Sequence, residues 1–257
     1  MDATGAVRLG ITPDGRWDID GAGLVAAAAA AGFTAVGLGA GQADAACAAE
    51  LARTGVDCHE LLALVVTADE EATVRAAVEL ASVAEAVRAR WVLTVFSAGL
   101  GPDTAPAIAR SAAVLAEVGA GMAVEFSPLG PVPSIPAALD VVEVAGVDRA
   151  GVLIDSWHFF RGDSTWRDLA TIPLEQIAYL QFDDAPEPIW DSPMRETLHR
   201  RAMPGEGTFE LDRFAGTLLD RGWTGTVSVE VLNAALRELP VPEFLARAYR
   251  SAARYWS

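Results

Sequence analysis

Four apolar stretches of this chain are each interrupted near their carboxyl end by a polar residue, and three of these four residues are acids. They are Glu125, Asp155, Gln181 and Glu230. If the side chains meet at one place, the three carboxylates repel one another and take up protons unless a cation lies among them. Oxygen ligands of this kind suit magnesium or manganese, whereas imidazole-rich sets favour zinc. The residue types therefore predict a divalent-metal site.

Two more polar residues near these acids are candidates for substrate contact. His158 follows Asp155 by three residues, so its imidazole contacts either the substrate or a neighbouring loop. Arg201 opens the segment 201–207, Arg-Ala-Met-Pro-Gly-Glu-Gly, whose glycines indicate a turn before a helix. Its guanidinium either binds a substrate hydroxyl, carbonyl or carboxylate, or is an ordinary surface charge. Substrate contact is the functional hypothesis for both residues.

The elements that must position these residues alternate along the whole chain. Short apolar runs alternate with helical patterns, which is typical of repeated βα units with a parallel sheet. We expect strands at Arg8–Ile11, Ala35–Leu38, Val56–Leu64, Trp91–Ser97, Ala123–Ser127, Val152–Ser156, Ile177–Phe182 and Thr226–Val231. We expect helices at Gly21–Ala31, Ala43–Arg53, Ala68–Arg90, Thr104–Val118, Ile135–Val144, Thr165–Ala170, Leu211–Asp220 and Val241–Ala253. This alternation predicts one α/β domain over residues 1–257, a (β/α)₈ TIM barrel whose catalytic groups lie at the carboxyl ends of the strands.

The remaining histidines and cysteines are expected to have structural roles. Residues 183–209 form the longest irregular stretch, and His199 is expected to be a loop residue within it. His59 is expected to be a hydrogen-bonded residue of the barrel. Cys47 and Cys58 are expected to be buried and reduced, because their spacing fits neither a zinc site nor a redox pair.

The composition excludes several classes of function. Hydrophobic residues make up 52% of the 257 residues and charged residues 21%, which is typical of a globular protein. The net charge of −16 disfavours contact with a nucleic-acid backbone. The chain contains no lysine, which excludes Schiff-base chemistry on lysine and the P-loop lysine. We expect a cytoplasmic protein, since no apolar stretch has membrane-spanning length and the start lacks the features of an export signal.

The polar residues at the strand ends resemble those of a known superfamily. Glu125, the pair Asp155-x-x-His158, Gln181, the Arg-x-x-Pro-Gly-Glu-Gly loop and Glu230 are similar to the motifs of the xylose-isomerase-like barrels. That superfamily contains sugar (phosphate) isomerases and epimerases, and the resemblance covers nearly the whole chain. Its members include ketose 3-epimerases, hydroxypyruvate isomerase, inosose isomerases and dehydratases, and dehydroshikimate dehydratase.

The resemblance implies a role for each of these residues. A divalent ion, manganese or magnesium, would be bound by Glu125, Asp155, Gln181 and Glu230. His158 and Arg201 would face the substrate. Many epimerases have histidine at the position of Gln181, whereas members similar to hydroxypyruvate isomerase use glutamine there. Ketose epimerases also place a further glutamate after the strand-five acid, where this chain reads Ser-Pro-Leu-Gly-Pro over residues 127–131, which argues against a free ketohexose substrate.

The expected function is that of a metal-dependent isomerase or epimerase of a small, sugar-like hydroxy-carbonyl compound, in which Glu125 and Glu230 exchange the proton next to the carbonyl. One alternative is a dehydratase acting on an inosose-like or dehydroshikimate-like substrate. Another is a sugar-binding subunit without turnover. The apurinic endonuclease branch of the superfamily is disfavoured because it needs several zinc-binding histidines and the chain has three histidines in all. We expect a small-molecule substrate, no nucleic acid or membrane partner, and an assembly that can include homo-oligomers.

Overall fold

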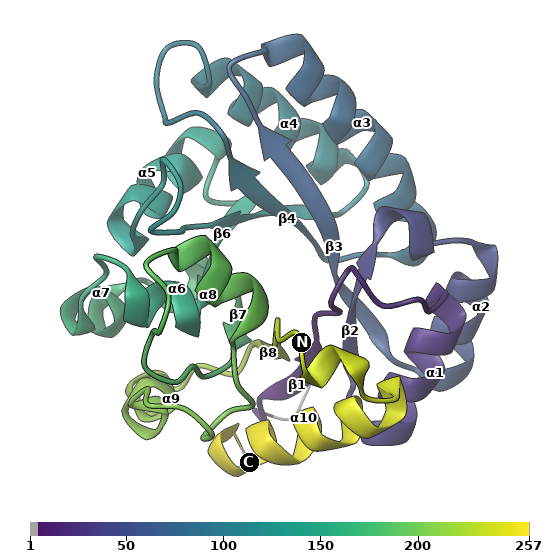
Figure 1. The fold of residues 1–257 in the computed structure, drawn as a ribbon. Coiled ribbons are helices and arrows are strands. Elements are labelled where there is room, and N and C mark those ends of the chain that lie inside the picture. Colours follow the sequence, from purple (N-terminus) through teal and green to yellow (C-terminus); the bar gives the residue numbers. More distant parts are fainter. Residues whose placement is uncertain (1–4, 257) are drawn as a thin grey trace.

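Eight parallel strands close into a barrel in the order of the sequence, and helices surround it (Figure 1). The structure is a computed structural model that describes residues 5–256. The strands are β1 Arg8–Ile11, β2 Ala35–Gly39, β3 Asp57–Val66, β4 Trp91–Phe96, β5 Gly121–Glu125, β6 Ala150–Asp155, β7 Ile177–Phe182 and β8 Thr226–Val229. The first strand pairs with the last, where Arg8 lies opposite Thr226 and Ile11 opposite Val229. This pairing closes the sheet, and the predicted TIM barrel is confirmed.

The helices form a ring outside the strands (Figure 1). Their bounds are α1 Gly21–Ala31, α2 Ala45–Thr54, α3 Glu70–Val87, α4 Ala105–Glu117, α5 Ile135–Ala145, α6 Ser156–Arg161, α7 Trp166–Thr171, α8 Pro193–His199, α9 Leu211–Leu219 and α10 Val241–Trp256, with short 3₁₀ helices η1 Ala40–Gln42, η2 Leu174–Gln176 and η3 Leu236–Glu238. Local sequence sets many of the ends. The side chains of Asp20, Asp44 and Asp69 accept backbone hydrogen bonds at the starts of α1, α2 and α3. Gly32 and Gly55 end α1 and α2 in the left-handed conformation, which glycine adopts without strain.

Apolar side chains fill the space between the strands and the surrounding helices. Leu38, Leu64, Ile108, Val141 and Phe214 are fully buried members of this one large cluster. Burial of apolar area on this scale is the main force that holds the helices on the barrel. The rim at the carboxyl ends of the strands is thereby fixed in shape.

The predicted element boundaries need several corrections. Residues 183–209 are not entirely irregular, because α8 lies within them and His199 is its last residue. This helix starts with a local signal, since the Ser192 side chain caps it and Pro193 occupies the first turn. The predicted strands at the fifth and eighth positions extend too far, because β5 ends at Glu125 and β8 ends at Val229. The helix α6 was also missed, since its six residues are too few to show a helical period.

The cysteines lie where the sequence indicates. Cys47 and Cys58 are buried and free of disulfide bonds. Burial, with the nearby carboxylates of Asp44 and Asp20, raises the pKa of the Cys47 thiol to about 11. The thiol therefore stays protonated at neutral pH and has little nucleophilic reactivity.

Among residues 5–256, no helix has both the length and the apolar character needed to cross a membrane.

Candidate active site

The four polar residues predicted to form a site lie at one rim of the barrel. Glu125 and Asp155 are the last residues of β5 and β6, Gln181 is the penultimate residue of β7, and Glu230 directly follows β8. Asp155 lies opposite Gln181 in the pairing of β6 with β7. Because neighbouring parallel strands end at the same side of the sheet, the four side chains belong to one cluster.

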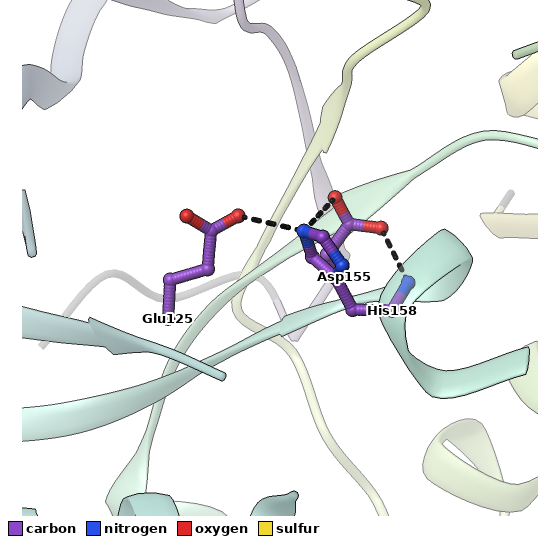
Figure 2. A group of neighbouring side chains, drawn as sticks. All are labelled: Glu125, Asp155 and His158. Atoms are coloured by element: carbon purple, nitrogen blue, oxygen red, sulfur yellow. Dashed lines mark hydrogen bonds and ion pairs between the residues drawn. The ribbon is translucent and has the colours of Figure 1, made fainter. Parts of the chain in front are cut away.

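His158 lies between two of the acids (Figure 2). Its Nε2 is 3.3 Å from Oε1 of Glu125 and 3.8 Å from Oδ2 of Asp155. Asp155 also caps α6, since its Oδ1 accepts hydrogen bonds from the backbone N–H groups of Trp157 and His158 at 2.6 and 3.3 Å. Glu125, Asp155 and His158 each offer a ligand atom within 4.8 Å of the other two, a spacing that could hold a metal ion.

Arg201 is buried at the centre of the acids. Its Nη1 donates to Oδ2 of Asp155 at 2.7 Å, to Oδ2 of Asp183 at 2.7 Å and to Oε2 of Glu230 at 2.9 Å. Its Nε and Nη2 donate to the hydroxyl of Thr197. The side chain is 2% exposed, so the alternative of an ordinary surface charge is wrong.

The loop that carries Arg201 is held by Asp184. The backbones of Asp184 and Ala202 exchange two hydrogen bonds, and Oδ2 of Asp184 accepts from the N–H groups of Gly205 and Gly207 at 3.0 and 2.9 Å. Gly205 has φ +81°, and a Cβ on Gly207 would collide with Asp184 and Ala185. The predicted turn therefore requires both glycines.

The charges of Arg201 and of the acids act together on Asp155 and His158. Burial by itself would raise the pKa of Asp155, but Arg201 and His158 outweigh it and lower that pKa. Burial opposes the charged form of His158, yet the carboxylates of Asp155 and Glu125 raise its pKa. Both shifts favour the charged form of the group.

The negative charges of Asp183 and Glu230 are compensated less well than that of Asp155. Burial raises the pKa of Asp183 to about 7, although Arg201 acts in the opposite direction. Burial also raises the pKa of Glu230 well above its usual range, again against the effect of Arg201. One guanidinium and one imidazole do not neutralise the four carboxyl groups of Glu125, Asp155, Asp183 and Glu230, so the site has the electrostatics that favour an additional cation.

Gln181 supplies the observation that tests whether a metal ion fits. Its Nε2 lies 3.4 Å from Oε1 of Glu230, while its Oε1 is buried without a hydrogen-bond partner among the described residues. An orphaned buried carbonyl oxygen costs about 1–3 kcal/mol. Such an oxygen beside carboxylates is a suitable ligand for a hard divalent ion. The residues present therefore fit a divalent ion.

A cavity of about 410 Å³ opens over this cluster. Glu125, His158, Arg201 and Glu230 all line it. The volume falls within the range of small-molecule sites. The predicted catalytic and substrate-facing residues thus border one space, and their roles in it remain predictions.

Two parts of the site were not found from the sequence. Asp183 is fully buried and accepts from Ser156 Oγ at 2.8 Å as well as from Arg201. Its position two residues after Gln181 was an available signal, because alternate residues of a strand share a face. The second part is a network around Glu60 in β3, whose carboxylate accepts hydrogen bonds from the hydroxyls of Thr12 and Tyr179.

The network around Glu60 also corrects the interpretation of His59. His59 is 1% exposed, but neither of its ring nitrogens has a hydrogen-bond partner among the described residues. Its Nε2 lies 3.4 Å from Oε1 of Glu60, within ion-pair range. Ser228 extends the network to β8 through a 2.7 Å contact with the hydroxyl of Thr12. No residue pattern identified these partners, because they come from strands far apart in the chain.

We expect Tyr179→Phe to lower the free energy of unfolding by about 1–3 kcal/mol, because it removes a donor from a buried carboxylate. Burial and the charge of Glu60 raise the pKa of Tyr179 well above 10, so its hydroxyl stays a donor at neutral pH. Urea unfolding would measure the effect. Tyr249→Phe is the control, since Tyr249 packs on Phe33 away from the site and should change stability by less than about 0.5 kcal/mol. Equal effects of the two substitutions would contradict the prediction.

A comparison with models of protein families shows to which family this chain belongs. The family model described as xylose isomerase-like TIM barrel matches residues 25–255. The chain belongs to this family. The resemblance inferred from the strand-end residues is thereby confirmed.

The curated relatives that match this chain are named as dehydratases or as isomerases. A 3-dehydroshikimate dehydratase of Pseudomonas aeruginosa is 34% identical over 103 residues, which are 40% of this chain and 16% of that protein. An inosose isomerase of Halalkalibacterium halodurans is 31% identical over 133 residues, which are 51% of this chain and 46% of that protein. The matches therefore span less than half of either relative. The family is one of isomerase, epimerase and dehydratase relatives.

Solved structures share the fold over nearly the whole chain. A crystal structure of the IOLI protein with a bound zinc atom has a TM-score of 0.81 at 18% identity, covering 98% of both chains. A D-allulose 3-epimerase from Methylomonas sp. has a TM-score of 0.74 at 14% identity, covering 97% of this chain and 98% of its own. At these identities the likeness shows the fold.

Proposed function

We propose that this protein is a metal-dependent isomerase or epimerase that moves a proton next to the carbonyl of a small hydroxy-carbonyl compound. The observation that carries this proposal is the position of Glu125 and Glu230. Both carboxylates line the same cavity, and they come from opposite ends of the run of strands β5 to β8. A substrate between them has one carboxylate available for removing a proton and another for returning it.

The proposed reaction uses these two residues in sequence. One carboxylate accepts the proton from the carbon next to the carbonyl, and the electron pair of the broken C–H bond moves onto the carbonyl oxygen to give an enediolate. One of the carboxylates then returns a proton, either to the neighbouring carbon or to the opposite face of the same carbon. When the neighbouring carbon takes the proton, the hydroxyl proton passes to the former carbonyl oxygen, and the hydroxyl oxygen becomes the new carbonyl oxygen. These outcomes are isomerisation and epimerisation, and neither needs an oxidant or reductant.

The carbon acid needs help to ionise. A divalent ion held by Glu125, Asp155, Gln181 and Glu230 would stabilise negative charge on the substrate oxygens. His158 is available either as a further ligand or as a donor to a substrate oxygen, since its Nε2 lies among the acids and its ring borders the cavity. Arg201 borders the cavity too, and its contacts with Asp155 and Glu230 hold those carboxylates in place. Contact of Arg201 with the substrate remains part of the proposal.

The test is solvent exchange by the wild-type protein. Small α-hydroxy ketones and inososes are incubated in deuterium oxide with manganese or magnesium, and proton NMR follows deuterium at the carbon next to the carbonyl. We expect exchange that stops when a chelator removes the ion. Absence of exchange with every compound, despite measured binding, would support a binding protein without turnover and contradict the proposal.

The partial similarity to a dehydratase gives a second candidate. The 34% identity over 103 residues to 3-dehydroshikimate dehydratase favours loss of a β-hydroxyl from the same enediolate. Dehydration creates a conjugated chromophore, so ultraviolet absorbance of the product separates the two reactions.

Purified protein should contain about one divalent ion per chain when no chelator is used. The reason is the crowding of Glu125, Asp155 and Glu230 around a single guanidinium. Plasma emission spectrometry measures the content, and Glu125→Gln combined with Glu230→Gln should remove most of it. Glu117→Gln combined with Glu143→Gln is the control, because neither acid lies at the cavity. Full occupancy in the first double variant would contradict the metal assignment.

A further inference from the structure

The cavity over the active site has two unlike sides. Its titratable groups come from β5, from α6, from the Arg201 loop and from the end of β8, and they are the residues of the proposed chemistry. The rest of its wall comes from β3, β4, the loop after β5, and α8. The apolar side chains there include Leu62, Phe96, Leu129, Val132, Met194 and Leu198.

The wall of the cavity away from the acids has, among the described residues, no cationic side chain that could bind an anionic substrate group. The chain has no lysine, and Arg201 is the guanidinium among the described residues that line the space. Its Nη1 donates to Asp155, Asp183 and Glu230 and its Nε and Nη2 to Thr197, so this guanidinium is held at the end of the cavity where the acids lie. A phosphate or carboxylate on the part of the substrate that lies against this wall would find no cation there, and its desolvation would go uncompensated.

The apolar wall is equally unsuited to a polyhydroxylated compound. Each buried hydroxyl needs a hydrogen-bond partner, and an unsatisfied one costs about 1–3 kcal/mol. The leucine, valine, methionine and phenylalanine side chains offer none, and the two hydroxyls of this wall, on Ser127 and Thr197, already accept hydrogen bonds from Leu129 and Arg201. The contribution of the apolar side chains is the burial of apolar area, which favours a ring or chain of carbon atoms.

We infer that the substrate is an uncharged compound in which the hydroxy-carbonyl group is joined to an apolar ring or chain. The polar end of this compound lies at Glu125, His158 and Glu230. Its apolar body lies against Phe96 and Leu129. The available volume of about 410 Å³ equals that of about fourteen water molecules in the liquid, which is enough for one six-membered ring and its substituents. This inference rests on the proposed function for the identity of the reacting group.

The test is calorimetric binding of three probes to the manganese-supplied protein. They are 2-hydroxyacetophenone, dihydroxyacetone and dihydroxyacetone phosphate, which share the hydroxy-ketone group and differ in the attached part. We expect the Kd of 2-hydroxyacetophenone to be lower than that of dihydroxyacetone by at least about tenfold, with the phosphate ester weakest of the three. Equal or tighter binding of dihydroxyacetone or its phosphate would overturn the inference.

A matched pair of variants locates the preference. Leu129→Asn keeps the side-chain size while making the wall polar, and it should reduce the preference for the aromatic probe to threefold or less. Leu100→Asn is the control, because Leu100 is 40% exposed and does not line the cavity. An unchanged preference in a folded Leu129→Asn variant would overturn the placement, and the wild-type ratio decides the inference if that variant does not fold.

Deuterium exchange of the same probes separates this inference from the proposed function. Exchange with dihydroxyacetone and not with 2-hydroxyacetophenone would support the proposed chemistry and overturn the substrate class. Tight binding of 2-hydroxyacetophenone without exchange of any probe would support the apolar ligand class and count against the proposed chemistry.

Discussion

Replacing either Glu125 or Glu230 by glutamine should slow exchange of the substrate α-proton by about 10²–10⁴-fold, the usual contribution of a positioned acid or base. Glutamine has nearly the size of glutamate but cannot accept a proton at neutral pH. The two residues line one cavity, so neither loss is replaced by solvent without a large decrease in rate. Proton NMR in deuterium oxide measures the exchange with the best substrate found for the wild-type protein.

Metal content must be measured on the same samples, because both residues are also predicted ligands. A variant that keeps its ion and binds substrate but does not exchange identifies the missing carboxylate as the base. Glu187→Gln serves as the control, since Glu187 is exposed on the loop after β7 and should leave the rate within twofold. Full turnover in both single variants would remove these two glutamates from the chemistry.

Replacing Arg201 by leucine should lower the free energy of unfolding by about 3–5 kcal/mol in chelator-treated protein at neutral pH. The guanidinium is buried and bonded to Asp155, Asp183 and Glu230, and its removal leaves those charges uncompensated. Carboxyl groups with a raised folded pKa destabilise the fold as the pH rises. The loss of unfolding free energy caused by Arg201→Leu should therefore be smaller at about pH 5 than at neutral pH, because the carboxyl groups left without Arg201 take up protons as the pH falls.

Urea unfolding with and without manganese extends this experiment. An ion bound among the acids replaces part of the missing positive charge, so manganese should stabilise the variant more than the wild-type protein. Arg200→Leu is the matched control, because Arg200 pairs with Glu196 nearer the surface and should cost less than about 1 kcal/mol. Equal losses in the two variants would show that the acids at the site do not depend on Arg201.

The fold was predictable because its signal is repetitive. Each βα unit adds an apolar run and a helical pattern, so errors of a few residues, as at β5, leave the barrel unchanged. The strand-end acids were predictable for a similar reason, since Glu125, Asp155 and Glu230 each break an apolar run at its carboxyl end. Both inferences depend on patterns that are local in the sequence.

The parts of the site that escaped prediction are not local. Arg201 was recognised as a candidate, but its burial among three carboxylates depends on how residues 183–209 fold back over the rim, which no periodicity reveals. The network combines Glu60 of β3, Tyr179 of β7 and Ser228 of β8 with Thr12, which directly follows β1. Individually these residues look like ordinary strand residues, and only the closed barrel brings their polar atoms together.

The pairing of β1 with β8 has a consequence for synthesis on the ribosome. Arg8 and Thr226, which face each other across the seam, are 218 residues apart, so the first strand keeps an unpaired edge until β8 has emerged. Exposed strand edges are prone to pair with other chains, and contacts this distant in sequence form slowly. The strand that ends this exposure also brings Glu230 to the rim. A nascent chain therefore acquires its protection from aggregation and the last of its proposed catalytic carboxylates in the same step.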